Sequence, residues 1–403
     1  MPHSMSSDAR SEGPEETDDH RRQNSHYYTA APGSVINDRY TVVSPLGHGR
    51  FSRVYRAVDG QSKTKQEVAL KIYRASADFY EYFKNELDIL ENLRGDTHPN
   101  VVSMLDSFTI ETDDDVHGVI VYEIVESDLK KYLRGKGVLT LSEARKVVAQ
   151  VAAGLDFLHE HGIIHADVKP ENLLVDNEFN VKVCDVGSGV LVGQIESYHV
   201  GTVPYLSPEL ILGVDYDTKV DVWSLGCLYF ELLTDECMFD PDLYFESDCS
   251  EDEAVVAEDA GGVAQPDPEG AAADPGMAVA DAADEGVDME ETLCETDSDE
   301  EDGDGYEWQT NHFQLSAFRA VLGSIPADLF KDGQYYHMYY NSRGRLRLVP
   351  RCIDDRRIKD LLVEEFEFPS DAAEQVEMEM LQLLKYDPAE RLDCKGAARM
   401  FGT

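Results

Sequence analysis

The sequence is poor in basic residues. Its 403 residues include 35 Lys and Arg against 80 Asp and Glu, which gives a formal net charge of −45 at pH 7. A chain of this charge is repelled by nucleic-acid phosphates and by anionic membrane surfaces, so we expect neither as a direct partner. The same charge favours protein partners that are themselves basic. Charge bears on association and solubility rather than on the fold.

The sequence also lacks the marks of a membrane-spanning or exported protein. No apolar run is long enough to cross a bilayer, and the first residues have neither the basic nor the apolar region of a signal peptide. The seven cysteines are odd in number and contain no C-x-x-C pair, which favours reduced thiols over a disulfide framework or a zinc site. We therefore expect the protein to work in the cytosol or the nucleus.

Composition separates parts of the chain that can fold from parts that cannot. The hydrophobic content of 42% is enough for a core, and the length favours about two or three folded units. Residues 1–37 are polar, charged and poor in aliphatic side chains, so we predict that they are disordered. Residues 246–305 hold 23 Asp or Glu and no Lys or Arg, which predicts a disordered acidic insert.

The acidic insert has two interpretations. It could be a solvated insertion that a surface loop tolerates. It could also be a docking or autoregulatory tether for basic proteins, modulated by phosphorylation at Ser250 or Ser298, which are both followed by acidic residues.

One polar stretch near the middle of the chain has the residue types that phosphoryl transfer requires. It reads His165-Ala-Asp-Val-Lys-Pro-Glu-Asn172 and is followed by Asp185-Val-Gly. The transition state of phosphoryl transfer is loose and spreads negative charge over phosphate oxygens, so catalysis depends on positioning and charge neutralisation. In this interpretation Asp167 accepts the proton of the attacking hydroxyl and Lys169 steadies the moving group. Asn172 and Asp185 hold metal ions.

Both stretches resemble the catalytic and metal-binding loops of eukaryotic protein kinases, whose patterns are H-R-D-x-K-x-x-N and D-F-G. Two departures are plain, since Ala166 replaces the usual Arg and Val186 replaces the usual Phe. A chance match on a polar loop is the alternative. The partner motifs of the family decide between the two readings, because they must also occur in the right order.

The first partner motif is Leu46-Gly-His-Gly-Arg-Phe-Ser-Arg-Val54, which resembles the kinase glycine-rich loop with Ser52 in place of the third Gly. Gly47 and Gly49 let the backbone approach phosphates without a Cβ in the way. Alone, a pair of glycines also fits an ordinary hairpin turn.

The second partner motif is a Lys and Glu pair. Lys71 ends the strand-like run Val68-Ala-Leu-Lys71, and Glu86 lies in an amphipathic segment over residues 79–92. By resemblance, Lys71 binds the α and β phosphates of ATP and pairs with Glu86. Without the other motifs, such a pair would be a surface ion pair of little energetic weight.

The segment Gly118–Glu126 follows, and the resemblance places it between a buried strand and the hinge that joins two lobes. Tyr122 is then the gatekeeper, and the backbones of Glu123 and Val125 meet adenine. A plain core strand fits the same residues. The resemblance assigns further nucleotide contacts to Leu46, Gly47, His48, Gly49, Val54, Ala69 and Leu174.

Helix signals surround the catalytic stretch. Thr140-Leu-Ser-Glu143 has the form of a capping box before an apolar stripe at helical spacing, and residues 219–233 form a second apolar helix that carries Asp221. By resemblance, Asp221 holds the backbone of the catalytic loop, and Glu209 forms a buried ion pair with Arg391.

The resemblance implies an α+β fold with two lobes. A small antiparallel β lobe with one helix would span residues 38–125. A larger, mainly helical lobe would span residues 126–245 and 306–403, with the acidic insert between these two parts. The implied cofactors are ATP and Mg²⁺, and the oligomeric state stays open.

The motifs are most similar to those of serine/threonine kinases, because Lys169 follows Asp167 by two places and Thr202 lies in the activation segment. The glycine-rich loop and residues 75–90 and 322–326 resemble SR-protein kinases and dual-specificity Tyr-regulated kinases of the CMGC group. The SR-protein kinases also lack the Arg that Ala166 replaces, and they imply Arg/Ser-rich substrates. Residues 201–209, however, lack the arginines of that group, and the insert lies within the large lobe rather than between the lobes.

Two competing functions belong to other classes. One is a pseudokinase scaffold that binds partners through its acidic segment, and the other is an acidic binding protein for basic partners. The first is disfavoured because every residue with proton, phosphate or metal chemistry is present. The second is distinguished by whether deletion of residues 246–305 removes binding and leaves ATP turnover. A further hypothesis follows from Ala166. Without an Arg beside Asp167, activity should not depend on phosphorylation of the activation segment.

Overall fold

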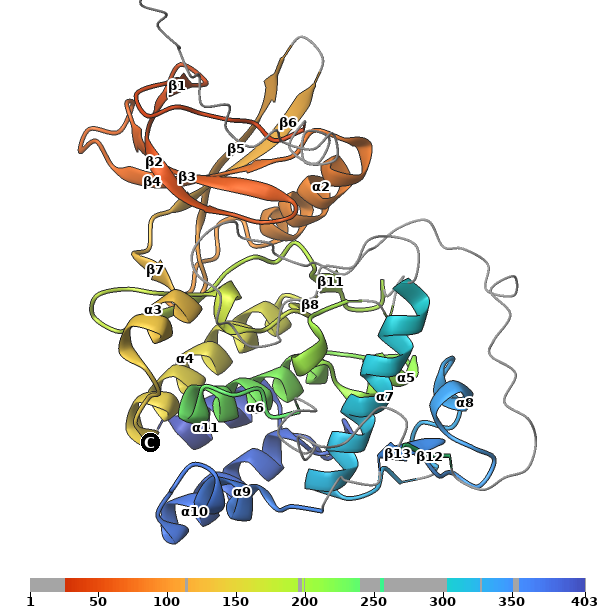
Figure 1. Cartoon of the computed structure of the whole chain (residues 1–403). Coiled ribbons are helices and arrows are strands. Elements are labelled where there is room, and N and C mark those ends of the chain that lie inside the picture. The colour runs from red at the N-terminus through yellow and green to blue at the C-terminus, as the bar shows by residue number, and fades with distance from the viewer. Residues whose placement is uncertain are drawn as a thin grey trace, which may run out of the picture.

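The computed structural model describes residues 26–112, 115–194, 198, 200–239, 254–256, 303–326, 328–350 and 355–402. These residues form a small lobe of β-strands above a larger, mainly helical lobe (Figure 1). The chain passes from the first lobe to the second directly after strand β6. This is the predicted α+β architecture with two lobes.

The small lobe is a six-stranded sheet with the order β1-β2-β3-β4-β6-β5, in which all neighbours are antiparallel. Side chains alternate between the two faces of the sheet, and the apolar ones of one face form a separate core. The strands are β1 (Val35–Ile36), β2 (Tyr40–His48), β3 (Ser52–Asp59), β4 (Glu67–Tyr73), β5 (Met104–Glu111) and β6 (Val116–Glu123).

One helix, α2 (Ala77–Asn92), packs against the other face of this sheet (Figure 1). Its N-terminus is capped by Ser76, whose hydroxyl accepts a hydrogen bond from the backbone of Phe79 at 3.3 Å. Phe83 and Leu90 of this helix are buried in the main core. The apolar periodicity of residues 79–92 therefore predicted the helix correctly.

The expected disorder of residues 1–37 is wrong for the part of that segment that the structure describes. Residues 26–37 lie on the small lobe, where β1 pairs with β2 and where Ala30 and Ile36 are buried. Tyr28 packs beside them. The prediction failed because the average composition of residues 1–37 is polar, and an average hides these few apolar and aromatic side chains. Residues 1–25 lie outside the described residues.

The large lobe is built around α4 (Leu141–Glu160) and α6 (Lys219–Thr234), which pack on each other. Thr140 and Glu143 form the predicted capping box at the start of α4. Its other helices are α3 (Leu129–Lys136), α5 (Pro208–Leu212), α7 (Gly303–Leu322), α8 (Tyr336–Tyr339), α9 (Ile358–Glu364), α10 (Ser370–Leu383) and α11 (Cys394–Phe401). No helix in the described parts of the chain has the length and apolarity to span a bilayer.

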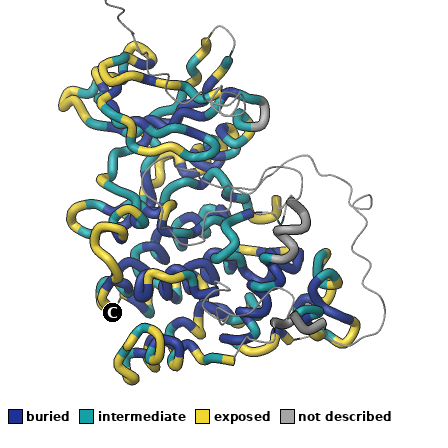
Figure 2. Tube along the Cα trace, viewed as in Figure 1, coloured by how far each residue is buried: buried dark blue, intermediate teal, exposed yellow. Residues whose placement is uncertain are grey.

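Helix α6 is the axis of this lobe. Every residue from Val220 to Thr234 is buried, and Figure 2 shows the buried segments gathered at the centre of the lobe. Trp223 of α6 lies 5.6 Å from the ring of Phe239 and 4.9 Å from the ring of Phe318, measured between ring centroids. This aromatic packing connects α6 with α7, which follows it only after the acidic segment.

Short strands and 3-10 turns complete the large lobe. One sheet has the order β10-β9-β7, a second joins β11 and β8, and a third joins β12 and β13. These elements are β7 (Ser127–Asp128), β8 (Ile163–Ile164), η1 (Pro170–Asn172), β9 (Leu173–Val175), β10 (Val181–Val183), β11 (Val190–Leu191), η2 (Val203–Tyr205), β12 (Ala254–Val256) and β13 (Leu348–Pro350).

The prediction of a wholly disordered insert over 246–305 needs two corrections. Strand β12 lies inside it and pairs antiparallel with β13, and helix α7 begins at Gly303. Ala254-Val-Val256 is an apolar and β-branched triplet, which suits a strand even among acidic neighbours. Residues 240–253 and 257–302 lie outside the described residues.

The predicted ion pair of Glu209 and Arg391 is present and completely buried. The Arg391 guanidinium donates to the Glu209 carboxylate at 2.5 and 3.1 Å, and the two side chains are 1% or less exposed. Arg391 also donates to the backbone carbonyl oxygens of Lys385 and Lys219 at 2.9 and 2.7 Å. The pair thereby joins α5, the start of α6 and the end of the chain.

Loss of Arg391 should destabilise the large lobe strongly. Arg391→Ala leaves the Glu209 carboxylate buried without a counter-ion, so we expect the free energy of unfolding to fall by about 3–5 kcal/mol. Urea denaturation followed by tryptophan fluorescence measures this loss, because Trp223 lies 5.2 Å from the guanidinium.

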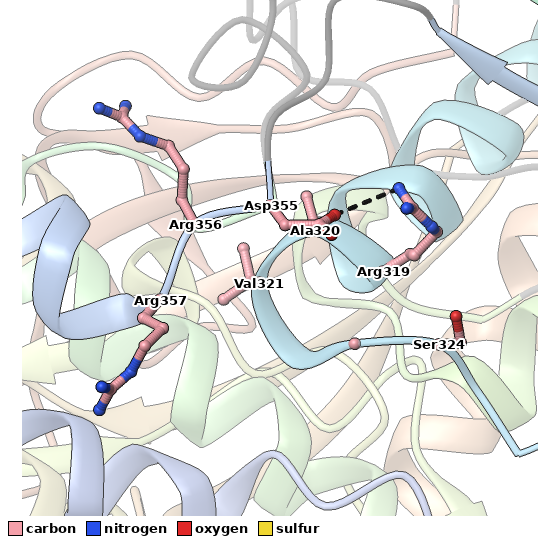
Figure 3. A pocket seen from close by; sticks show the side chains of 8 residues that line it. Arg319, Ala320, Val321, Ser324, Asp355, Arg356 and Arg357 are labelled. Atoms are coloured by element: carbon pink, nitrogen blue, oxygen red, sulfur yellow. Dashed lines mark ion pairs between the residues drawn. The ribbon is translucent and has the colours of Figure 1, made fainter.

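Arg356 provides the matched control. It lines a surface cavity of about 190 Å³ between α7 and α9 (Figure 3), and its partners Glu364 and Glu365 are 60% and 47% exposed. Arg356→Ala should therefore cost only about 0–1 kcal/mol. Equal losses in the two variants would contradict the importance of the buried pair.

Candidate active site

The sheet register places the predicted phosphate-binding residues in one row. Gly47 of β2 is opposite Val54 of β3, and Val54 is opposite Lys71 of β4. Residues directly opposite each other point to the same face of a sheet, so these three positions face the same side. Ala69, two residues before Lys71, lies on this face as well and is opposite Tyr122 of β6.

Lys71 meets its predicted partner. Its Nζ lies 2.7 Å from Oε2 of Glu86 and 2.9 Å from Oδ1 of Asp185. The Glu86 carboxylate is completely buried under the sheet. Burial lowers the pKa of Lys71, but the charges of Asp185 and Glu86 outweigh it and leave the pKa raised, so the side chain stays an ammonium. Helix α2 is thus turned inward, which the sequence could not show.

Two tyrosine hydroxyls complete the shell around Glu86. Tyr73 donates to Oε2 and Tyr122 donates to Oε1, so the carboxylate accepts from three donors when Lys71 is included. Burial raises the pKa of both tyrosines well above the usual value, and the charge of Glu86 raises it further. Both phenols therefore stay protonated and act as donors.

Tyr73 was missed in the sequence. A usable signal existed, because Tyr73 follows Lys71 by two places and alternate residues of a strand share a face. The resemblance implies that Tyr122 is the gatekeeper, and its contact with Glu86 is an addition from the structure.

Asp167 is held through both of its carboxylate oxygens, one by the catalytic loop and one by the activation segment. Asn172 Nδ2 donates to Oδ2 at 2.8 Å, and the Thr202 hydroxyl donates to Oδ1 at 2.7 Å. Lys169 Nζ lies 3.2 Å from Oδ2 and donates to the Thr202 hydroxyl at 2.7 Å. The sequence-predicted residues Asp167, Lys169, Asn172 and Thr202 are therefore in direct contact.

Asp221 anchors this loop from below, as predicted. Its carboxylate accepts from the backbone N–H groups of His165 and Ala166 at 2.9 and 2.8 Å and from His159 Nε2 at 2.8 Å. Burial raises the pKa of Asp221, but the bonds and charges of the two histidines outweigh it and lower the pKa, so the group is ionised. Ala166 has a φ of 64°, a left-handed conformation that costs energy for a residue with a Cβ. The Asp221 contacts hold it there.

Asn172 and Asp185 are suited to hold Mg²⁺. The amide nitrogen of Asn172 donates to Asp167, so the amide oxygen of Asn172 is the atom left to bind a metal ion. Burial raises the pKa of Asp185, but Lys71 and the backbone of Gly187 lower it overall, so the carboxylate is charged. The described residues contain no cluster of three or more His, Cys, Asp and Glu that could hold a metal ion. Mg²⁺ fits such a partial ligand set, because it usually takes one or two carboxylates and completes its shell with phosphate and water oxygens.

Hydrogen bonds to backbone carbonyls join the metal-binding segment to the catalytic loop and to α2. The Cys184 N–H donates to the Asn172 carbonyl at 3.0 Å, and Cys184 lies directly before Asp185. Asn85 of α2 donates its amide to the carbonyl oxygens of Gly187 and Gly189 at 2.9 and 3.2 Å. A Cβ on Gly187 would lie 3.0 Å from Glu86 Oε2, so a side chain there would crowd the buried carboxylate.

The predicted adenine contacts lie on both lobes. Leu46, Val54, Ala69 and Leu174 are each partly buried. Glu123 follows Tyr122 at the end of β6, and its side chain accepts from the Ser103 backbone at 2.8 Å and from Lys182 at 3.0 Å. These bonds fix Glu123 at the junction of the lobes, and Val125 lies two residues further on, just before β7. His48 is exposed near the tip of the glycine-rich loop.

Comparison with known proteins agrees with this geometry. The family model described as protein kinase domain matches residues 40–269. The serine/threonine-protein kinase SRPK of Physarum polycephalum is 25% identical over 440 residues, which cover 94% of this chain and 88% of that protein.

Two other relatives are similar over a shorter part. Mitogen-activated protein kinase 14 of Arabidopsis thaliana is 32% identical over 53% of this chain and 59% of its own. Dual specificity tyrosine-phosphorylation-regulated kinase 3 of Homo sapiens is 34% identical over 53% of this chain and 36% of its own. The matching region thus spans less than two thirds of these two relatives.

The hydroxyl of Tyr73 should be needed to keep Glu86 buried. Tyr73→Phe removes one donor from a buried carboxylate and should lower the free energy of unfolding by about 1–3 kcal/mol. Thermal and urea denaturation measure the change. Tyr80→Phe is the control. Tyr80 lies on α2, the helix that carries Glu86, and its ring packs against Phe83, 5.6 Å away between centroids. A loss no larger than in the control would contradict the role of Tyr73.

Proposed function

The chain belongs to the protein kinase family as a serine/threonine kinase, and from this premise we propose that it transfers the γ-phosphoryl group of ATP to Ser or Thr hydroxyls of basic proteins. The observation that carries the proposal is the unbroken set of contacts from Glu86 through Lys71 to Asp185, beside a held Asp167. A pseudokinase scaffold has no need of this arrangement.

The residues divide the work of the reaction between the two lobes. Lys71 would hold the α and β phosphates of ATP, and Asn172 and Asp185 would hold Mg²⁺. When bound, Mg²⁺ neutralises charge on the phosphate oxygens.

In this proposal Asp167 accepts the proton of the substrate hydroxyl. Hydrogen bonds to both of its oxygens fix the carboxylate, so it does not have to be oriented during the reaction. Lys169 contacts both Asp167 and Thr202 and would bring positive charge to the moving phosphoryl group.

Three observations support basic substrates. The net charge of −45 attracts cationic proteins. The relative that covers most of this chain carries the name SRPK. Glu171 is exposed in the catalytic loop. Burial raises the pKa of Glu231, and the negative charge of Glu171 nearby raises it further. A cationic substrate side chain near the reacting hydroxyl would meet this negative charge.

We also propose that the protein acts in the cytosol or nucleus, in keeping with reduced thiols. Among the cysteines that the structure describes, Cys184, Cys227 and Cys394 form no disulfide. Burial raises the pKa of the Cys184 thiol well above its usual value, which supports an unreactive side chain beside Asp185.

The first experiment is transfer of radiolabelled phosphate from ATP with Mg²⁺ to an Arg/Ser-repeat peptide, myelin basic protein and casein. We expect transfer by the wild type, preference for the basic substrates, and a loss of at least about 100-fold in Asp167→Ala. Wild-type protein that binds ATP but transfers nothing would favour the pseudokinase scaffold.

Glu171→Gln tests the substrate class within the same assay. It removes one negative charge without changing the shape of the side chain. We expect KM for the Arg/Ser peptide to rise about three- to ten-fold, with KM for casein unchanged. An equal change for both substrates would count against direct recognition of basic residues.

We further propose that activity does not depend on a phosphorylated activation segment. Ala166 offers no positive charge, and the Tyr198 hydroxyl lies 3.2 Å from the Asp215 carboxylate, which would repel a phosphate there. Ser197, another candidate for modification, lies outside the described residues. Phosphatase-treated protein should keep its kcat within about two-fold, by the same charge argument. Loss of activity traced to this segment would contradict the proposal.

A further inference from the structure

Residues 26–37 form a strap that lies on the small lobe before the matched kinase domain begins at residue 40. Backbone bonds fasten both ends of the strap. The Ala75 N–H donates to the His26 carbonyl at 2.9 Å, and β1 pairs with β2 at the other end. In between, the Tyr55 hydroxyl accepts from the Ala30 backbone at 3.3 Å and donates to the Tyr28 carbonyl at 3.1 Å.

Within this strap, Tyr27 reaches the tip of the glycine-rich loop. Its hydroxyl lies 2.9 Å from the carbonyl oxygen of Gly49 and 3.0 Å from that of Arg50. These residues form the turn between β2 and β3. One hydroxyl proton is thus shared between two successive carbonyls of the loop that covers phosphates in this family.

The ring of Tyr27 is itself held in place by two guanidinium groups. Arg53 and Arg74 lie 4.6 and 4.5 Å from its centroid, a distance at which a cation and an aromatic face attract each other. Arg74 also lies 4.4 Å from the ring of Phe79 in α2. The strap is therefore connected through Arg74 to the helix that carries Glu86.

Two further hydrogen bonds support the loop tip, because Arg74 Nη1 donates to the Arg50 carbonyl at 3.2 Å and the Gly49 N–H donates to the Ser52 carbonyl at 2.9 Å. A Cβ on Gly47 or Gly49 would meet no heavy atom within 4 Å, so these positions are not held by packing around them. Phe51, at the far end of the turn, is anchored separately, because its ring lies 4.4 Å from that of Tyr82 and its carbonyl accepts from the Arg74 backbone at 2.9 Å. Tyr27 anchors the Gly49 carbonyl and shares the Arg50 carbonyl with Arg74.

From these contacts we propose that Tyr27 is a positioning residue for ATP, whose hydroxyl holds the tip of the glycine-rich loop over the phosphates. The proposal rests on the proposed kinase function. It extends the functional unit beyond the matched domain, because the residue that fixes the phosphate loop lies in the preceding segment. A held loop has less conformational freedom to lose when it closes on phosphates, which favours binding.

The test uses the full chain with Tyr27→Phe, which removes the hydroxyl and keeps the ring between the two arginines. Dissociation constants are measured by calorimetry for ATP with Mg²⁺ and for adenosine, which has no phosphates. We expect the ATP constant to rise about three- to ten-fold, the effect of one hydrogen bond, and the adenosine constant to stay unchanged. Hydrogen–deuterium exchange of residues 46–54 in the absence of nucleotide should become faster.

Tyr28→Phe is the matched control, because it removes a hydroxyl from the same strap but its ring packs on His117, 5.3 Å away between centroids. It should change neither the two constants nor the exchange of residues 46–54. Unchanged exchange and ATP affinity in Tyr27→Phe would overturn the proposal, as would equal weakening of ATP and adenosine.

The outcomes separate this proposal from the proposed function. Wild-type protein that does not bind ATP would overturn both the kinase function and the role of Tyr27 in binding phosphates. Wild-type protein that binds ATP but transfers no phosphate would overturn the kinase function alone, since the effect of Tyr27→Phe on ATP binding does not depend on transfer.

Discussion

The buried carboxylate of Glu86 is the constraint on which the small lobe depends. A charge at a completely buried position is costly unless donors surround it, and here one ammonium and two phenols do so. These donors come from β4 and β6, while the carboxylate comes from α2. Satisfying one charge therefore fixes the helix against the sheet. The same ammonium reaches Asp185, so the position of α2 is transmitted to the metal-binding segment of the other lobe.

The large lobe uses the same device twice. Asp221 is buried in the central helix and holds the catalytic loop by its backbone, and Glu209 is buried against Arg391 and holds the activation segment to the end of the chain. In a chain with 80 acidic residues, buried carboxylates such as these must be matched by specific donors, because an unpaired buried charge is costly.

The strap formed by residues 26–37 shows that the limits of a sequence family need not be the limits of a functional unit. The matched domain starts at residue 40, yet Tyr27 contacts the turn between β2 and β3, and Arg74 connects the strap with α2. The glycine-rich loop and the helix of Glu86 are thus both linked to a segment whose composition suggested disorder.

The sequence by itself determined the kinase fold and predicted the residues of phosphoryl transfer, because the order and spacing of short motifs such as His165–Asn172 are local properties of the chain. Capping signals and apolar periodicity likewise predicted α2, α4 and α6. Only the tertiary structure decided that α2 lies inward, that Tyr73 and Tyr122 share Glu86, and that β12 pairs with β13. Each of these depends on side chains or strands brought together from distant parts of the chain or from across a sheet, and composition and spacing do not encode such distances.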